Sequence, residues 1–162
     1  MPDAICNTSP LVYLYRIEAM EWLAQLFEEV WIPTAAVEEL VEGRRRGYDV
    51  PVPNEYAWLR VVDPRATPSE WLSLDLGPGE LAAMALALEN PTRILLLDDM
   101  LARTTSQAAG LTVWGTLRVL LEGKSQGFTA TIEPFVTRLT DSGMWLSDDV
   151  RQRILRLAGE GQ

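Results

Sequence analysis

The stretch "RILLLDDM", Arg93 to Met100, decides the fold because it joins a buried strand to two adjacent carboxylates. Its isoleucine and leucine run without polar alternation, which is typical of a parallel strand covered on both faces. The run ends abruptly at Asp98 and Asp99. We therefore expect both aspartates at the carboxyl edge of a sheet, which is where α/β folds bind ligands.

The rest of the chain alternates between strand-like and helix-like patterns. Strands are expected at residues 4–6, 30–33, 59–63, 93–99 and 111–115. Helices are expected at 11–27, 35–43, 80–90, 100–110, 116–127, 131–141 and 147–158. Thr8 or Ser9 is expected to cap the first helix, which continues through residue 27, and Thr34 to cap the one that stops at Gly43. This alternation predicts an α/β fold with a mainly parallel sheet. The length of 162 residues, without a linker or repeat, predicts one domain, residues 1–162.

The composition of the chain limits which ligands it can bind and which residues can catalyse a reaction. The net charge of −9 argues against tight nonspecific binding to nucleic acid. It leaves nucleic acid open as a substrate, because metal cations change the charge of a carboxylate cluster. The chain has no histidine, so hydrolytic chemistry would depend on carboxylates.

Two further features predict a cytoplasmic protein. The single cysteine, Cys6, excludes an intrachain disulfide or a thiolate zinc site and favours a reducing compartment. The chain has no apolar run near the roughly 18 residues that a bilayer needs, and its start lacks the pattern of a signal peptide. We expect no membrane association.

Polar side chains follow several of the predicted strands. Asn7 follows the first strand, Glu38 and Glu39 lie about one turn into the helix after the second, and Glu80 opens the helix that begins with "GPGE". If these residues share one crevice with Asp98 and Asp99, they form a cluster of oxygen ligands. Such a cluster suits Mg²⁺ or Mn²⁺ rather than zinc or copper.

Each of these residues also has a purely structural interpretation. Glu80 would favour the positive end of its own helix, and the glutamates at 38, 39 and 42 would form a solvated face. Asp99 precedes Arg103 by four residues, which is the spacing of a helical ion pair. Asp98 would cap the helix that follows it.

The separated motifs "CNTSPLVYL", "VWIPTAAVEELVEG", "LGPGELAAMALALE", "ILLLDDMLARTTSQAAGLTVWGTLRVLLEGKSQG" and "LTDSGMWLSDD" together resemble the PIN-domain family. The chain is similar in particular to the branch related to VapC-type toxins, with its N-T-[ST]-P-L start, its G-x-G-E motif, and its L-D-[DE]-x-x-A-R motif followed by G-T-L. The resemblance covers nearly the whole chain. It implies a parallel sheet flanked by helices, in a three-layer α/β/α arrangement.

The resemblance also implies a function. Active members of the family are ribonucleases in which acidic residues bind Mg²⁺ or Mn²⁺, which makes RNA the expected substrate. The implied metal ligands are Asn7, Glu39, Glu80 and Asp98, with Glu39, Glu80, Asp98 and Asp99 as the catalytic set. Thr8, Ser9, Arg103 and Thr116 match polar positions that would bind substrate. A homodimer is expected by analogy alone.

Asn7 departs from the family pattern, since most catalytic members carry aspartate at this position. Asparagine offers a neutral carbonyl oxygen in place of a carboxylate, which weakens binding of a hard dication. The alternative is therefore a weakened or inactive binding module that pairs with an antitoxin-like protein, whose basic segment would suit the acidic balance. Trp22, Trp31, Trp58 and Trp71 would mark that interface if exposed, or pack in the core if not.

Overall fold

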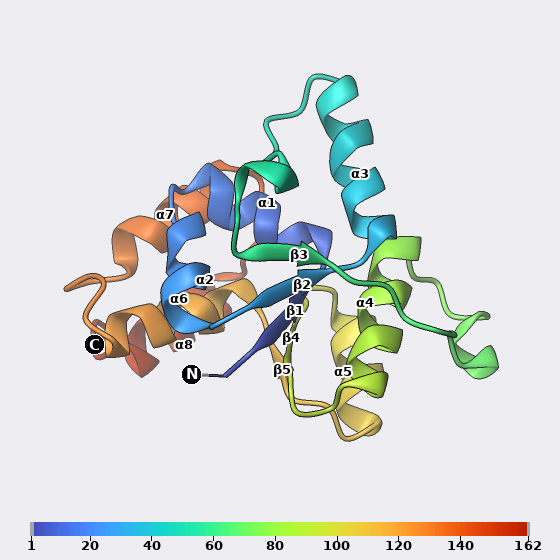
Figure 1. Ribbon diagram of the computed structural model, residues 1–162. Coiled ribbons are helices and arrows are strands. Elements are labelled where there is room, and N and C mark those ends of the chain that lie inside the picture. Colours follow the sequence, from blue (N-terminus) through green and yellow to red (C-terminus); the bar gives the residue numbers. More distant parts are fainter. Residues whose placement is uncertain (1, 162) are drawn as a thin grey trace.

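The computed structural model describes residues 2–161 and has a five-stranded sheet at its centre (Figure 1). Its strands are β1 (Ala4–Cys6), β2 (Val30–Ile32), β3 (Leu59–Val61), β4 (Ile94–Leu96) and β5 (Val113–Trp114). They pair in the order β3-β2-β1-β4-β5, and every pairing is parallel. The parallel sheet predicted from the alternating pattern is confirmed.

Eight α-helices accompany this sheet in residues 2–161. They are α1 (Thr8–Arg16), α2 (Met20–Leu26), α3 (Thr34–Arg45), α4 (Pro78–Glu89), α5 (Met100–Ala108), α6 (Thr116–Ser125), α7 (Glu133–Asp141) and α8 (Asp148–Leu157). Short 3₁₀ turns occur at Pro53–Glu55 and Ser69–Trp71. None of the helices in the part of the chain described is long and apolar enough to cross a bilayer.

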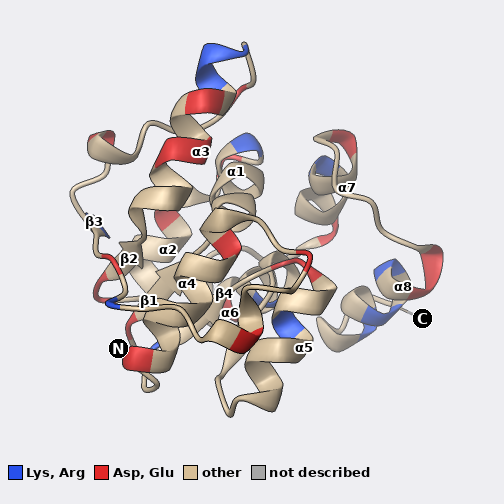
Figure 2. Cartoon of the chain, turned by 90° about the vertical axis from the view of Figure 1, so that its right-hand side faces the viewer, with Lys and Arg blue, Asp and Glu red and all other residues tan. Residues whose placement is uncertain are grey.

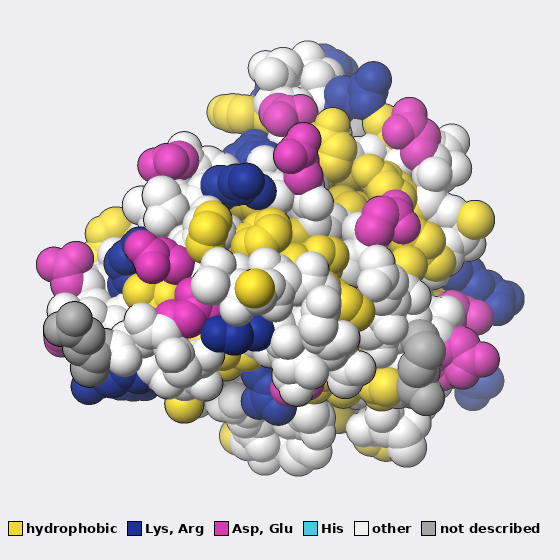
Figure 3. All heavy atoms as spheres, turned by 90° about the vertical axis from the view of Figure 1, so that its left-hand side faces the viewer, with side chains coloured by type: hydrophobic (Ala, Val, Ile, Leu, Met, Phe, Trp, Pro, Cys, Tyr) yellow, Lys and Arg dark blue, Asp and Glu magenta, His cyan; other side chains and the backbone are white. Residues whose placement is uncertain are grey.

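The strands bury both of their faces, because successive side chains point to opposite sides of the sheet. Ala4 and Cys6 pack into one core with α1, α2 and α6, whereas Ile5 packs into a second core with α4 and α5. Helices α7 and α8 extend the first layer, and α3 projects from the end of the sheet (Figure 1). The outer surface of the first layer mixes apolar, acidic and basic side chains (Figure 3). The three-layer α/β/α arrangement is confirmed.

The boundaries of the first two helices differ from the prediction. The chain does not run as one helix to residue 27, because Glu18 adopts a positive φ of 63° and separates α1 from α2. A left-handed conformation at a residue other than glycine leaves no mark in the sequence. Neither Thr8 nor Ser9 caps α1, because Asn7 occupies the N-cap position. The Asn7 side chain makes no capping hydrogen bond.

Helix α3 also departs from its predicted limits. Thr34 is its first residue rather than its cap, and Pro33 precedes it. The helix passes Gly43, which has an ordinary helical environment, and ends at Arg45. There Arg45 and Arg46 both form ion pairs with Glu42, at 2.8 and 2.9 Å.

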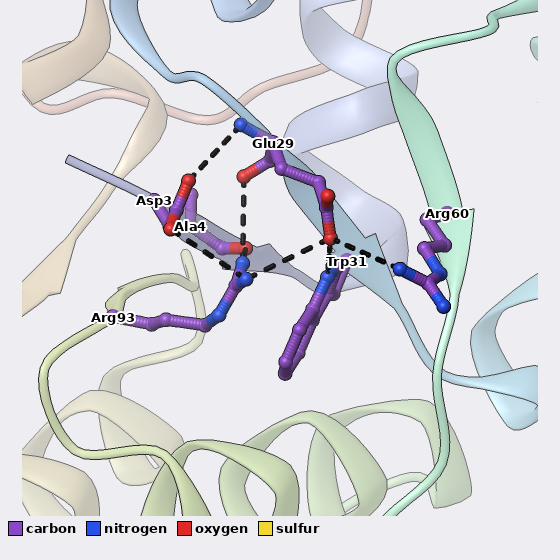
Figure 4. A network of polar contacts seen from close by, with 6 residues as sticks. All are labelled: Asp3, Ala4, Glu29, Trp31, Arg60 and Arg93. Carbon is purple, nitrogen blue, oxygen red and sulfur yellow. Dashed lines mark hydrogen bonds and ion pairs between the residues drawn. The ribbon is translucent and has the colours of Figure 1, made fainter. Parts of the chain in front are cut away.

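A buried arginine holds the amino ends of three strands together, at the edge opposite the candidate site (Figure 4). Arg93 is 9% exposed and donates to the carbonyl oxygens of Ala4 (3.1 Å) and Glu29 (3.5 Å). Its guanidinium group lies 3.3 Å from the ring centroid of Trp31, and it pairs with the carboxylates of Asp3 and Glu29. These contacts give Arg93 a structural role.

The tryptophans divide between core and surface. Trp22 and Trp71 are buried, and Trp31 and Trp58 are half-buried, so core packing explains most of their area. Trp145 differs, because its side chain is 84% exposed.

Candidate metal-binding site

Asn7 and Asp98 lie at the carboxyl ends of the neighbouring strands β1 and β4. These strands pair with Cys6 opposite Leu96, and the backbone N–H of Asn7 donates to the Leu96 carbonyl at 3.2 Å. Asn7 is only 2% exposed, and its side-chain oxygen Oδ1 has no hydrogen-bond donor among the described residues. A buried amide oxygen without a donor costs free energy, so this atom is suited to meet a cation or another donor.

The Asp98 carboxylate is held by the first residue of α6. Thr116 donates from its backbone N–H to Oδ1 (2.8 Å) and from its hydroxyl to Oδ2 (2.7 Å). Thr116 is fully buried. Burial raises the pKa of Asp98, against the opposing effects of the two Thr116 bonds and of the positive charge on Arg103.

The same arrangement occurs a second time in the sheet. Asp63 follows β3 by two residues, as Asp98 follows β4, and it accepts from the backbone N–H (2.7 Å) and hydroxyl (2.6 Å) of Thr34. Thr34 opens α3 as Thr116 opens α6. The carboxylate–threonine pair therefore helps to hold the start of a helix at both places. The pair at Asp98 differs in that Thr116 is fully buried and Asp98 half-buried, whereas Thr34 and Asp63 are exposed.

Glu39 connects three elements of the fold. Its Oε1 accepts a 2.6 Å hydrogen bond from the Thr8 hydroxyl of α1, and its Oε2 accepts a 3.1 Å bond from the backbone N–H of Gly79 in α4. A Cβ atom at Gly79 would lie 2.4 Å from Glu39 Oε1, so only glycine leaves room for this carboxylate. Glu38, one position earlier, is exposed.

Glu80 lies next to Glu39. Its Oε1 accepts from the backbone N–H of Gly77 at 3.1 Å, which stabilises the start of α4 as the structural interpretation expected. A Cβ atom at Gly77 would lie 3.4 Å from Glu80 Oε1 and 3.6 Å from Glu39 Oε2, so both carboxylates flank this glycine. Partial burial raises the pKa of Glu80, and the negative charges of Asp99 and Glu39 raise it further.

Asp99 and Arg103 do not pair as the helical spacing suggested. Asp99 is the N-cap of α5 and accepts from the backbone N–H of Ala102 at 2.9 Å. Among residues 2–161 no ion pair joins Asp99 to Arg103, whose charge instead acts on Asp98. The helix cap expected at Asp98 is thus made by its neighbour. Ser9 is half-buried beside Thr8.

The carboxylates form two groups rather than one closed shell. Glu39 and Glu80 flank Gly77, whereas Asp98 lies with Thr116 and Arg103. Within residues 2–161, no three histidine, cysteine, aspartate or glutamate side chains are gathered closely enough to hold one metal ion as they stand. The expectation that Glu39, Glu80 and Asp98 already meet in one pocket is therefore not met by this arrangement.

The donor chemistry nevertheless fits a hard divalent cation. All the candidate ligands are oxygen atoms, as Mg²⁺ and Mn²⁺ prefer, and they belong to segments that meet at one edge of the sheet. Figure 2 shows acidic segments on α3 and in the loop that leads into α5. Among the described residues, the Oδ1 of Asn7 is the one candidate ligand atom that is both buried and without a hydrogen-bond partner.

Comparison with known proteins decides the family. A family model described as PIN domain matches residues 3–160. The chain belongs to the PIN-domain family. Members of this family are generally nucleases and typically use a divalent metal.

The fold of this PIN domain is also similar to a solved structure. That structure is a PilT N-terminus domain protein from the hyperthermophilic archaeon Sulfolobus solfataricus P2. The two share 16% sequence identity with a TM-score of 0.54, over 74% of this chain and 92% of the other. No curated protein matches the sequence.

Proposed function

We propose that this PIN domain is a metal-dependent ribonuclease that hydrolyses RNA phosphodiester bonds with Mg²⁺ or Mn²⁺. Family membership supports nuclease chemistry, and the oxygen-only donor set supports a hard cation. The observation that carries the proposal is the buried, unpartnered Oδ1 of Asn7 at the end of β1, next to the strand that ends at Asp98. A structural residue in that place would be expected to have its polar atom satisfied.

In this proposal Asn7, Glu39, Glu80 and Asp98 close around the cation when it binds, because before binding their carboxylates form two groups. A divalent cation bound there supplies charge neutralisation of the phosphate and a lowered pKa of coordinated water. Thr116 fixes the orientation of Asp98 with two hydrogen bonds, and Thr8 and the Gly79 N–H fix that of Glu39. Because these contacts already restrict the two carboxylates, the carboxylates lose less conformational entropy when they bind a cation.

Three other predicted residues have supporting roles. Asp99 holds the start of α5 and adds negative charge beside Glu80. Arg103 is placed next to Asp98, where its guanidinium group can contact a phosphate. Ser9 is the remaining predicted substrate contact and follows Thr8 in α1. The toxin-like role, an antitoxin-like partner, a homodimer and a cytoplasmic location remain predictions.

Cleavage of a labelled RNA, with and without Mn²⁺, tests the proposal. We expect Mn²⁺-dependent cleavage by the wild type, and its loss in Asp98→Asn and Glu80→Gln. Asn7→Asp should cleave faster, since it adds a negative charge where the site lacks one. Exposed Asp75→Asn serves as the charge-matched control and should cleave like the wild type. Undiminished cleavage by Asp98→Asn would refute the assignment, and inactivity of every variant, including Asn7→Asp, would favour the binding module.

A further inference from the structure

A groove opens beside Asp98 between the start of α5, α6, α8 and the segment before α8. It has a volume of about 550 Å³. Asp98 is the one acidic residue in its lining among the described residues, whereas Arg103, Arg118 and Arg153 all line it. In a chain with a net charge of −9, this groove is a local excess of positive charge.

Two of the three arginines are free to meet an anion. Arg118 pairs with Glu122 at 2.8 Å, but within residues 2–161 no carboxylate lies within 4.0 Å of the charged groups of Arg103 or Arg153. Basic segments of α5 and α8 are visible in Figure 2. The groove is therefore positively charged, as expected of a surface that binds a polyanion.

Trp145 lies at the groove with its side chain 84% exposed, more than any other large apolar side chain described. It has no aromatic partner among the described residues. Met100 and Leu157, which also line the groove, are 73% and 67% exposed. An exposed indole beside unpaired guanidinium groups is the combination with which proteins bind single-stranded nucleic acid.

We propose that this groove binds single-stranded RNA and guides it to the candidate metal site. An unpaired base stacks on Trp145, Arg153 and Arg103 contact the backbone phosphates, and the strand continues to Asp98. The inference rests on the proposed ribonuclease function and adds the groove residues that hold the strand outside the metal site. Duplex RNA is excluded from this mode because its bases are already stacked on each other.

Binding is tested by fluorescence anisotropy of a labelled single-stranded oligoribonucleotide in the presence of chelator, so that no cleavage occurs. We expect Trp145→Leu to raise Kd about tenfold, because it removes the stacking surface, and Trp145→Phe to retain most of the affinity. The high exposure of Trp145 makes both replacements compatible with the fold.

An arginine pair provides a second test on the same helix. Arg153→Gln should lower the slope of log Kd against log salt by about 0.7, the value for one phosphate contact to a single strand. Arg151→Gln is the matched control, because Arg151 is engaged with the Thr137 hydroxyl at 3.1 Å and does not line the groove. Its slope should equal that of the wild type.

Equal affinity of Trp145→Leu and the wild type would overturn the inference, as would equally tight binding of duplex RNA or the absence of RNA binding. A groove that instead bound a protein segment would give one of these results. Binding and hydrolysis are judged separately. If binding depends on Trp145 but no variant cleaves RNA with Mn²⁺, the groove stands and the ribonuclease proposal fails.

Discussion

Replacing Thr116 by valine tests how the fold holds the central carboxylate. The change is nearly isosteric, so it leaves no cavity, and the backbone N–H continues to donate to Asp98 Oδ1. It removes the 2.7 Å bond from the hydroxyl to Oδ2, in a residue that is fully buried. A hydrogen bond to a charged group contributes about 1.5–3 kcal/mol, so unfolding should become easier by this amount. For a chain of this size the melting temperature should fall by about 3–12 °C.

The equivalent pair at Thr34 and Asp63 supplies the control for this experiment. It has the same two bonds but is solvent-exposed, so Thr34→Val should cost only about 0.5–1 kcal/mol. Urea unfolding monitored by circular dichroism measures both variants, and Thr116→Ser should recover most of the loss. If Thr116→Val and Thr34→Val lost equal stability relative to the wild type, the argument that burial strengthens the hydrogen bond at Asp98 would be refuted.

Three other substitutions give distinct expected outcomes. Gly79→Ala should change stability by less than about 1 kcal/mol, because the Glu39 side chain can move aside. In a calorimetric titration it should nevertheless weaken Mn²⁺ affinity about tenfold or more, because it displaces that carboxylate. Gly43→Ala is the control, since its Cβ would make only ordinary contact with Val50 at 3.7 Å, and it should leave Mn²⁺ affinity unchanged. Arg93→Met should cost about 2–4 kcal/mol in urea unfolding, because it breaks the buried bonds at the amino edge of the sheet, without altering Mn²⁺ binding. Burial raises the pKa of Asp98 above its ordinary 3.8, so the folded state favours the protonated carboxyl. As the pH rises from the ordinary pKa to the raised one, ionisation of Asp98 therefore lowers the stability of the wild type. In chelator, the stability advantage of Asp98→Asn over the wild type should therefore grow from about pH 4 upward and then level off; an advantage that does not change with pH would contradict this reasoning.

The architecture was largely predictable because it depends on patterns that are local in the sequence. The apolar run before Asp98 predicted β4 and its burial on both faces, and β4 occupies Ile94–Leu96 between β1 and β5 in the parallel sheet. The last helix, predicted over 147–158, is α8 (Asp148–Leu157), and the Ser147 side chain caps it by accepting from the Val150 N–H at 3.1 Å. What failed locally, such as the break at Glu18, depends on a backbone conformation that its residue type does not require.

The site was predictable only in part, because its geometry depends on contacts between distant segments. Sequence spacing assigned Arg103 to Asp99, but the turn into α5 makes Asp99 a cap and leaves Arg103 beside Asp98. The bond between Glu39 and the Gly79 N–H spans 40 residues, and no local pattern identifies Glu39 as the partner. The "GPGE" motif did contain the signal, since a glycine before Glu80 permits the close approach of another carboxylate.

The groove beside Asp98 was missed for a related reason. Trp145 and Arg153 belong to the C-terminal segments, which meet α5 and α6 only in the folded chain. The six tryptophans of the sequence gave no indication of which one is exposed. Exposure of a single aromatic side chain follows from how neighbouring helices end and pack, and this is not encoded by residue type alone.

The most direct test of the central claim is the binding of Mn²⁺ followed by electron paramagnetic resonance, which requires no turnover and no RNA. The account predicts that the wild type binds Mn²⁺, that Asn7→Asp binds it more tightly, and that Glu80→Gln and Asp98→Asn lose most of the affinity while keeping the wild-type circular dichroism spectrum. Unchanged Mn²⁺ affinity in both Glu80→Gln and Asp98→Asn would contradict it, because these two side chains would then not share a cation.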